Sequence, residues 1–409
     1  MNNFNQFVFS LLGCLSFFIG NAQFHGVNEI LGSKEVYTTI LPSLTLPNDA
    51  RAAGMGDCGV ATAADVNSLF YNPAKYAFAE KKNGIGLTHT PWKRQLVPDI
   101  SLTSLSWYRK FDTSSALAFS FRYFDFGRTE FTSFLGGNQE PYEFSIDGAY
   151  THKLNSKLSL GISLRYIYSN LVPNQPSIGI IIVGKGTSVT GDLSLYYQSQ
   201  TQIRGHNSIL AYGMNIQNIG TKINYTYPGQ NYLLPAMLRM GAAMEIESTS
   251  NHAIMATIEI TRLLVPVIPF NKNQIYGGWG DDDDTTIIYP KYNIDNRAGV
   301  FEGIAKSFHD SPDGFIGEIK EFNWSLGLEY SFMERYFLRT GYFHESFSKG
   351  NRRYFTFGTG MKFKNFEFNF AYLLPQVSDS PLKNTYKIGL NLEFESIAQK
   401  WKHFTTRFD

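Results

Sequence analysis

The sequence is poor in cysteine, has no excess of charge of either sign, and lacks a long apolar run after its first residues. Only Cys14 and Cys58 occur among the 409 residues. The formal net charge is +1, which excludes a broadly basic surface for nucleic acid and a broadly acidic one for a basic partner. Beyond the N-terminal segment no stretch of ~18 apolar residues occurs, which excludes a membrane-spanning helix. Strands can cross a membrane without such a run.

Residues 7–19 form an apolar stretch that is too short and too early for a membrane-spanning helix. We expect residues 1–23 to be a secretory signal peptide cleaved near Gln23, although no Lys or Arg precedes the stretch. Residues 11–14 loosely resemble a lipobox, so lipidation of Cys14 is an alternative, which is weakened because the apolar segment continues past Cys14. After cleavage near Gln23, Cys58 is the single thiol and no internal disulfide can form.

Aromatic residues and glycine are plentiful. Aromatic side chains make up 15% of the chain, with 24 Tyr and 34 Phe, and there are 36 Gly. Membrane β-barrels carry aromatic rings at both membrane interfaces. A soluble β-sandwich can share this composition, so the pattern along the chain has to separate the two.

From about residue 84 the sequence alternates with a period of two, the spacing of a strand with two different faces. Polar and charged residues repeatedly occupy the alternate positions, as the lumen side of a barrel requires. Fourteen such segments are predicted, at about 84–90, 99–108, 115–125, 143–152, 157–169, 187–199, 207–217, 235–247, 252–263, 322–333, 335–345, 353–363, 365–374 and 385–394.

The predicted connections alternate in length. Those near residues 112, 155, 206, 250, 334 and 365 are short, and those near 95, 136, 174, 227, 282, 350 and 378 are longer on average. Short periplasmic turns opposite longer outer loops are typical of outer-membrane barrels. The sequence therefore predicts an all-β membrane barrel of about fourteen antiparallel strands at 84–394, located in the cell outer membrane.

The last predicted strand follows the order polar–x–Gly–x–x–apolar–x–aromatic over residues 387–394. This order is similar to the terminal-strand signal by which outer-membrane barrels are recognised for insertion. Residues 395–409, which follow it, are expected to be a periplasmic tail.

Residues 24–83 show no alternation and contain runs of small residues at 49–56 and 60–65. Small residues allow close packing in a confined space, and Pro73 stops any helix there. We expect this segment to fold into the lumen as a plug, with a loose periplasmic tail as the alternative. Its motif residues are Asp49, Arg51, Gly54, Gly56, Asp57, Asn72 and Pro73.

Residues 48–74, with Asn72-Pro73-Ala74 ahead of about fourteen strands, resemble the FadL superfamily of outer-membrane transporters. Within that superfamily, residues 47–57, 62–68 and 71–75 are much more similar to the PorV family, as are residues 89–92 and 96–108. Members of the PorV family are barrel subunits of the type IX secretion system of Bacteroidota.

This resemblance implies a function in protein handling. Barrels of the family associate with the giant translocon barrel, bind secreted cargo proteins through their C-terminal signal domains, and carry them to a cell-surface attachment complex that contains a sortase-like protease. No catalysis is implied. A FadL-like channel for hydrophobic small molecules such as long-chain fatty acids, gated by the plug, is the alternative. A lipid-modifying enzyme ranks third, because it would need Ser, His and acidic side chains converging on one barrel edge.

Two apolar loop segments are candidates for partner binding. Aliphatic residues in an outer loop would each gain about 1.5–3 kcal/mol from leaving water. They are interpreted as contacts to the translocon or to a cargo signal domain, with strand addition as one route, or as loops that fold inward or extend a strand. The residues are Ile178, Ile180, Ile181, Ile182 and Val183 in the first segment, and Leu263, Leu264, Val265, Val267, Ile268 and Phe270 in the second.

Motifs for catalysis and metal binding are missing. The 8 His residues are scattered without metal-ligand spacing, and no GxSxG, P-loop or HExxH pattern occurs. Residues Asp281–Asp284 could attract Ca²⁺ through hard oxygen ligands, but a solvated acidic loop is the preferred interpretation. No catalytic residue, metal ligand or cofactor is predicted.

Overall fold

The computed structural model describes residues 35–37, 39–92, 99–131, 137–171, 185–225, 231–269, 299–377 and 380–395. The chain divides into two units, residues 1–33 and 34–409, and all described residues belong to the second. The predicted signal peptide at 1–23 lies outside the described residues, as does residue 396 onward of the predicted tail.

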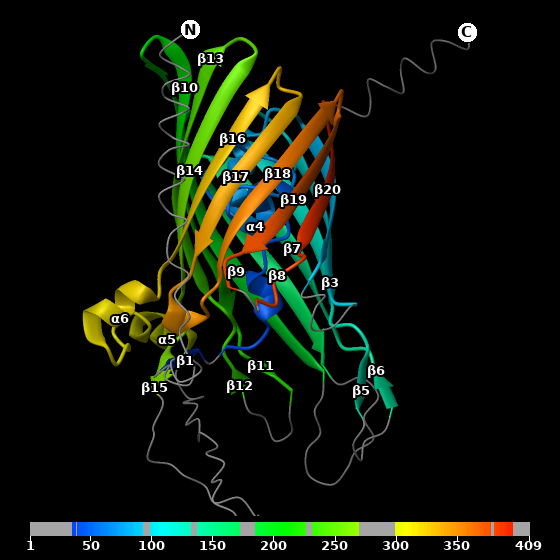
Figure 1. The fold of residues 1–409 in the computed structure, drawn as a ribbon, viewed down its shortest axis with the longest axis vertical. Coiled ribbons are helices and arrows are strands. Elements are labelled where there is room, and N and C mark those ends of the chain that lie inside the picture. Colours follow the sequence, from blue (N-terminus) through cyan, green and yellow to red (C-terminus); the bar gives the residue numbers. More distant parts are fainter. Residues whose placement is uncertain are drawn as a thin grey trace, which may run out of the picture. The chain divides into compact units, whose positions relative to one another are not determined.

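Fourteen antiparallel strands form a closed barrel (Figure 1), which confirms the predicted fold class. Consecutive barrel strands pair with one another, and β20 pairs back with β2 through Asn83 and Phe394. The observed bounds lie close to the predicted ones, and the largest difference is the end of β9, at Ile203 instead of residue 199. The barrel strands are β2 (Asn83–Pro91), β3 (Ser101–Lys110), β4 (Ser115–Asp125), β7 (Tyr142–Lys153), β8 (Leu158–Asn170), β9 (Gly186–Ile203), β10 (His206–Gly220), β13 (Met237–Thr249), β14 (His252–Leu263), β16 (Asn323–Phe332), β17 (Tyr336–His344), β18 (Arg353–Phe363), β19 (Phe366–Pro375) and β20 (Tyr386–Phe394).

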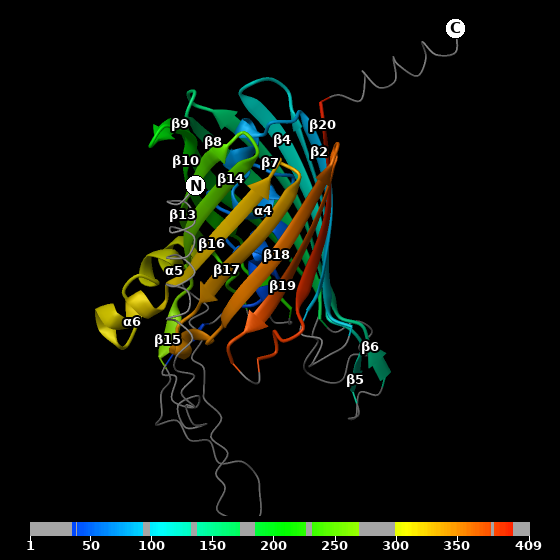
Figure 2. The ribbon, with the colours of Figure 1, turned by 45° about the horizontal axis from the view of Figure 1, so that its top comes forward.

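One end of the barrel, which we call the turn end, carries short connections such as residues 204–205 and 250–251. The opposite end, the loop end, carries the long connections and the small elements within them (Figure 2). These are β5 (Thr129–Phe131), β6 (Gly137–Gln139), β11 (Ile223–Asn224), β12 (Asn231–Tyr232), β15 (Val267–Pro269), α5 (Val300–Lys306), α6 (Gly314–Lys320) and η4 (Phe347–Lys349). The helices α5 and α6 were not predicted from the sequence. Among the described helices, none is long and apolar enough to cross a membrane.

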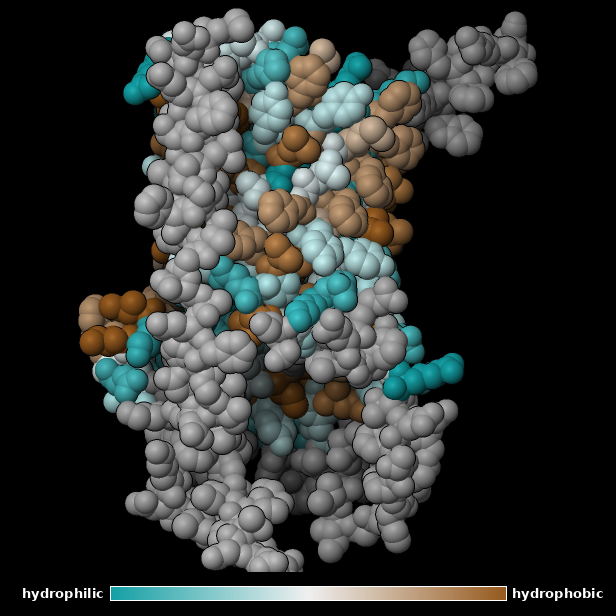
Figure 3. All heavy atoms as spheres, viewed as in Figure 1, coloured by the Kyte–Doolittle hydropathy of each residue, from teal (hydrophilic) through white to brown (hydrophobic). Residues whose placement is uncertain are grey.

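The barrel wall is apolar outside and polar inside. On β8, Leu164 is 69% exposed whereas its neighbour Arg165 is 2% exposed. Because successive side chains of a strand point to opposite faces, this alternation sends one set to the membrane and the other to the lumen. Figure 3 shows the apolar atoms gathered on the outer face of the strands.

Aromatic side chains gather near both ends of the wall, as the interfaces of a membrane barrel require. At the loop end the rings of Tyr123 and Tyr142 stack with their centroids 5.8 Å apart. At the turn end the ring of His252 lies 5.1 Å from that of Phe332.

Candidate functional site

Residues 39–82, which we call the inner segment, run through the barrel from the loop end to the turn end. Thr39 forms a β-bridge with Leu233 in a loop-end connection. At the other end the carbonyl of Ala79 accepts a hydrogen bond from Lys110 Nζ at 2.6 Å. Figure 1 shows α4 surrounded by the strands. The elements of the segment are η2 (Pro42–Thr45), α3 (Ala50–Ala53), α4 (Ser68–Tyr71) and η3 (Pro73–Phe78); outside it, β1 (Glu35–Tyr37) pairs with β15.

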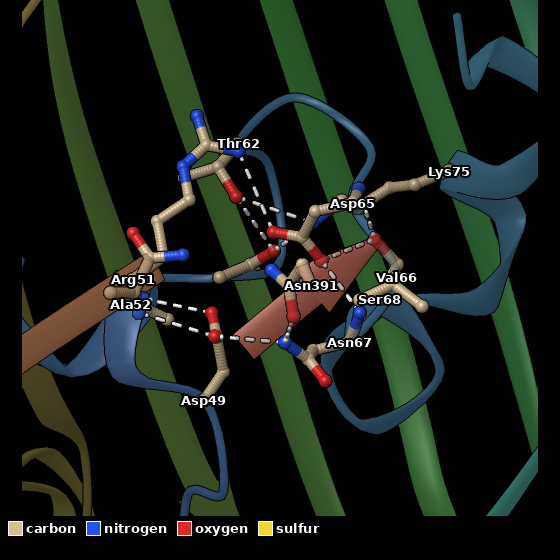
Figure 4. Close-up of polar contacts among 12 residues, drawn as sticks. Asp49, Arg51, Ala52, Thr62, Asp65, Val66, Asn67, Ser68, Lys75 and Asn391 are labelled. Atoms are coloured by element: carbon tan, nitrogen blue, oxygen red, sulfur yellow. Dashed lines mark hydrogen bonds and ion pairs between the residues drawn. The ribbon is translucent and has the colours of Figure 1, made fainter. Parts of the chain in front are cut away.

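Asp49 organises the first helix of the inner segment (Figure 4). Its carboxylate accepts hydrogen bonds from the backbone N–H of Arg51 at 3.1 Å and of Ala52 at 2.9 Å. An acidic N-cap satisfies amides that have no partner inside the helix. Asn67 Nδ2 also donates to this carboxylate, at 3.0 Å, so that Asp49 joins α3 to the stretch that precedes α4.

Arg51 connects the inner segment to the wall through a buried ion pair. Its Nε and Nη2 atoms lie 3.1 and 2.9 Å from the two carboxylate oxygens of Glu329 on β16. Arg339 on β17 donates to the same carboxylate. Asp65, within the inner segment, lies 3.5 Å from Arg51 Nη1. Two-point pairing of this kind fixes orientation as well as distance.

Gly54 and Gly56 lie directly against the backbone of the wall. Gly56 has a φ of +68°, and a Cβ added to it would lie 2.7 Å from the carbonyl oxygen of Tyr342. A Cβ on Gly54 would lie 3.1 Å from Cα of Gly358. The hydroxyl of Thr356 accepts from Gly56 N at 2.9 Å and donates to the carbonyl of Gly54 at 3.0 Å. A larger residue at Gly56 would meet both backbone strain and wall atoms.

Polar and charged side chains of the wall also bind residues 57–60 of the inner segment. Tyr354 donates to the carboxylate of Asp57, and Lys387 Nζ lies 3.3 Å from the same carboxylate. On β14, Glu259 accepts from the backbone N–H of Gly59 at 2.7 Å and of Val60 at 2.9 Å.

Asn72 and Pro73 join α4 to η3 and to the wall. Asn72 Nδ2 donates to the carbonyls of Val60 at 3.0 Å and Leu195 at 2.9 Å, and its Oδ1 accepts from Ala74 N at 3.0 Å. The carbonyl of Pro73 accepts from Thr151 Oγ1 at 2.7 Å. An Asn side chain can bind both the carbonyl groups and the backbone N–H because it carries a donor and an acceptor.

The seven motif residues singled out in the sequence therefore lie together inside the barrel. Sequence reasoning missed their side-chain partners on the strands, which include Thr151, Glu329, Tyr354, Thr356 and Lys387. The available signal was weak: each partner is a polar residue at an inward position of an alternating strand, a property that many other residues share.

A second buried polar cluster fastens α5 and α6 to the loop end of β14. Arg262 donates to the carbonyl of Ser307, to Glu318, and to Glu321 at 2.6 Å. Its guanidinium lies between two aromatic rings, those of Phe308 at 4.7 Å and Phe322 at 4.9 Å. Burial raises the pKa of the Glu321 carboxyl to about 7, and Arg262 opposes this shift.

The predicted partner-binding residues differ in their placement. Leu264, Val265 and Val267 are buried, with exposed fractions of 4%, 1% and 5%, and Leu263 is half-buried. Val267 and Ile268 belong to β15, which pairs with β1. Partner binding by these residues stays a prediction. Ile178–Val183, Phe270 and Asp281–Asp284 lie outside the described residues.

Carboxylates that could bind a cation also occur at the loop end. Within the described part of the chain, Asp310, Glu318 and Glu321 place ligand atoms within 4.8 Å of one another. Arg262 and Lys349 already supply positive charge there, since Lys349 Nζ lies 3.0 Å from Glu321. The arrangement is that of an ion-pair cluster.

Two cavities border the inner segment and the loop end. One has a volume of about 20 Å³ and is lined by Ser43, Arg122 and Glu143 among others. The other has a volume of about 10 Å³ and lies between Asn218, Val265 and Ile304. Each is large enough for about one water molecule, and far smaller than a pocket for a fatty acid or an aromatic hydrocarbon.

A model of the family described as type IX secretion system protein PorV matches residues 31–270, which is more than half of the chain. No curated protein matches the chain.

Several solved structures are similar in fold. The toluene transporter TbuX of Ralstonia pickettii is 11% identical, with a TM-score of 0.45 and coverage of 86% of this chain and 99% of that chain. The toluene transporter TodX of Pseudomonas putida is 12% identical, with a TM-score of 0.45 and coverage of 87% and 98%. A FadL homologue of Pseudomonas aeruginosa is 11% identical, with a TM-score of 0.41 and coverage of 88% and 100%.

Proposed function

Because the chain belongs to the PorV family of type IX secretion system proteins, we propose that it binds secreted cargo proteins through their C-terminal signal domains and carries them from the translocon to the attachment complex at the cell surface. By family and fold, the protein is an outer-membrane β-barrel component of type IX secretion. The proposal adds cargo binding and transfer, without catalysis by the barrel.

The observation that carries the proposal is the way in which the inner segment occupies the barrel. Glu259, Glu329 and Lys387 lie on three different strands, and each binds the segment by hydrogen bonds or ion pairs. Breaking buried charged contacts of this kind costs several kcal/mol each. A segment bound in this way acts as a fixed plug, which favours work at the outer surface of the barrel over transport through it.

The channel hypothesis requires a different chemical character of the barrel lumen. A channel for fatty acids needs an apolar pocket in the lumen, whereas several of the wall residues that bind the inner segment here are charged, such as Glu259, Glu329 and Lys387. The secretion hypothesis is therefore preferred.

The proposed partners are the giant translocon barrel, cargo proteins with C-terminal signal domains, the attachment complex with its sortase-like protease, and outer-membrane lipid. A tagged chain purified from a detergent extract of its own host should co-purify with the translocon barrel, identified by mass spectrometry. An untagged strain provides the control. Recovery of the tagged chain without the translocon would count against the proposal.

Deletion of the gene separates the two hypotheses. We expect cargo with C-terminal signal domains to accumulate in the periplasm and to return to the surface when the gene is restored. Normal surface display of cargo in the deletion strain would refute the proposal. Loss of fatty-acid uptake together with normal display would favour the channel.

A further inference from the structure

Helix α6 turns its polar side toward the protein and its apolar side away from it. Gly317 and Glu318 are buried. In contrast, Phe315, Ile316 and Ile319 are 79%, 65% and 53% exposed. Their spacing of one and four residues places these three side chains on one side of the helix. A helix on the surface of a protein in water has the opposite arrangement.

Helix α5 and the turn that follows it extend this apolar surface. Phe301 is 77% exposed and Phe308 is 37% exposed. In Figure 3 the apolar atoms of the helix pair form a patch at the left edge of the molecule. Apolar side chains gathered on one face mark a site of contact with protein or with membrane.

The apolar face is held in place by the protein. Arg262 on β14 binds the carbonyl of Ser307 after α5 and the carboxylates of Glu318 and Glu321 at the end of α6. Lys349 pairs with Glu321 from a further connection. The buried contacts therefore point the polar side inward and leave the apolar side outward.

The same arrangement continues into the neighbouring wall. Helix α6 is followed within a few residues by β16, whose Leu326 is 46% exposed on the outer face. On the adjacent strand β14, Ile258 and Ile260 are 44% and 37% exposed. The outward side chains of α6, β16 and β14 named here are all apolar, and on the strands they face lipid.

We propose that α5 and α6 form an interfacial anchor, which inserts Phe301, Phe315 and Ile316 between the headgroups and acyl chains of the outer leaflet beside β14 and β16. Amphipathic helices with large apolar residues on one face bind membranes at this depth. Lipid is favoured over a protein partner because the polar-inside, apolar-outside arrangement is that of the lipid-facing wall itself. The anchor fixes how deep the loop end sits at the membrane surface.

Fluorescence quenching by spin-labelled lipid tests the anchor. The full chain carrying Phe315→Cys and Cys14→Ser is labelled with an environment-sensitive fluorophore and reconstituted into phosphatidylcholine vesicles. The native Cys58 is 0% exposed, so it does not react in the folded protein. Leu326→Cys on the wall is the lipid-facing control, and Arg128→Cys in a loop-end connection is the water-facing control, since the Arg128 side chain is 71% exposed.

We expect the label at 315 to emit at shorter wavelength than the label at 128. It should also lose intensity with lipid that is spin-labelled at the headgroup or the top of the acyl chain, while the label at 326 responds most to deeper spin labels. A label at 315 that behaves like the one at 128 would overturn the proposal. So would a photo-crosslinker at 315 that captures a protein and no lipid in cells. Loss of cargo transport in the deletion strain tests the proposed function independently of either result.

Discussion

The guanidinium of Arg51 and the carboxylate of Glu329 form a two-point ion pair between residues that lie 278 positions apart in the chain. Arg51 belongs to the first helix of the inner segment and Glu329 to strand β16. Arg339 shares the same carboxylate. Charged residues of the wall thus bind the inner segment at this point, and substitutions here should show how strongly the segment is held.

Glu329→Gln should destabilise the barrel more than Arg51→Gln. Loss of the carboxylate removes the shared partner of two buried guanidinium groups, whereas loss of Arg51 leaves Glu329 paired with Arg339. Breaking a buried pair costs about 3–5 kcal/mol, so we expect a loss of this size for Glu329→Gln. The measurement is denaturant unfolding of the purified barrel in detergent.

Arg128→Gln is the matched control for these two variants. Arg128 and Glu140 form an ion pair in which the side chains are 71% and 65% exposed, and such pairs contribute about 0–1 kcal/mol. Equal losses for the exposed and the buried pair would contradict the role assigned to Glu329.

Gly341→Ala should displace the inner segment from the wall near Gly56. A Cβ at this position would lie 2.2 Å from the backbone nitrogen of Gly56. Overpacking of this kind costs about 1–3 kcal/mol, and we expect Cys58, which is fully buried, to become reactive. Maleimide labelling of the folded protein measures this change.

Gly148→Ala provides the comparison for Gly341→Ala, because its added Cβ would meet only the ring of Phe119, at an ordinary contact distance of 3.4 Å. Its Cys58 should stay protected. If Cys58 is labelled as slowly in Gly341→Ala as in Gly148→Ala, the close contact between Gly341 and Gly56 does not hold the inner segment in place.

Glu259→Gln should loosen the middle of the inner segment. The carboxylate accepts from two backbone N–H groups and from Arg239 at 2.7 Å, while an amide has one oxygen to accept with. Each buried donor left unsatisfied costs about 1–3 kcal/mol. Ion conductance across planar bilayers should rise above that of the wild type, whereas Glu247→Gln, at an exposed position of β13, should leave it unchanged.

Arg262→Gln should release α5 and α6 from the barrel without unfolding it. The guanidinium is the common partner of Ser307, Glu318 and Glu321, so its loss removes all three contacts. Limited proteolysis should cut residues 299–322 faster, with the strands intact. Glu321→Gln should have a smaller effect, because burial already disfavours the charged form of that carboxyl. Equal protection of the wild type and Arg262→Gln would show that the helices are held by other contacts.

The sequence by itself determined the strands. Alternation is a local property, because every strand of a membrane barrel must present one face to lipid and one to the lumen. Segments such as residues 115–125 and 252–263 were therefore predicted with the bounds that the structure has. The small residues around Gly54 and Gly56 likewise indicated close packing, although the sequence did not show against what.

The tertiary structure decided which residues meet. Glu329 and Glu259 are single inward acids on alternating strands, and nothing local distinguishes them from other lumen residues. Their pairing with Arg51, Gly59 and Val60 depends on the closure of the barrel around a segment from the other end of the chain. Helices α5 and α6 were not predicted for a related reason. Glu318 faces inward and Phe315 outward because Arg262 on β14 binds the Glu318 carboxylate. Sequence periodicity indicates which residues of a strand face lipid and which face the lumen. Only the closed barrel determines which lumen residues bind each other.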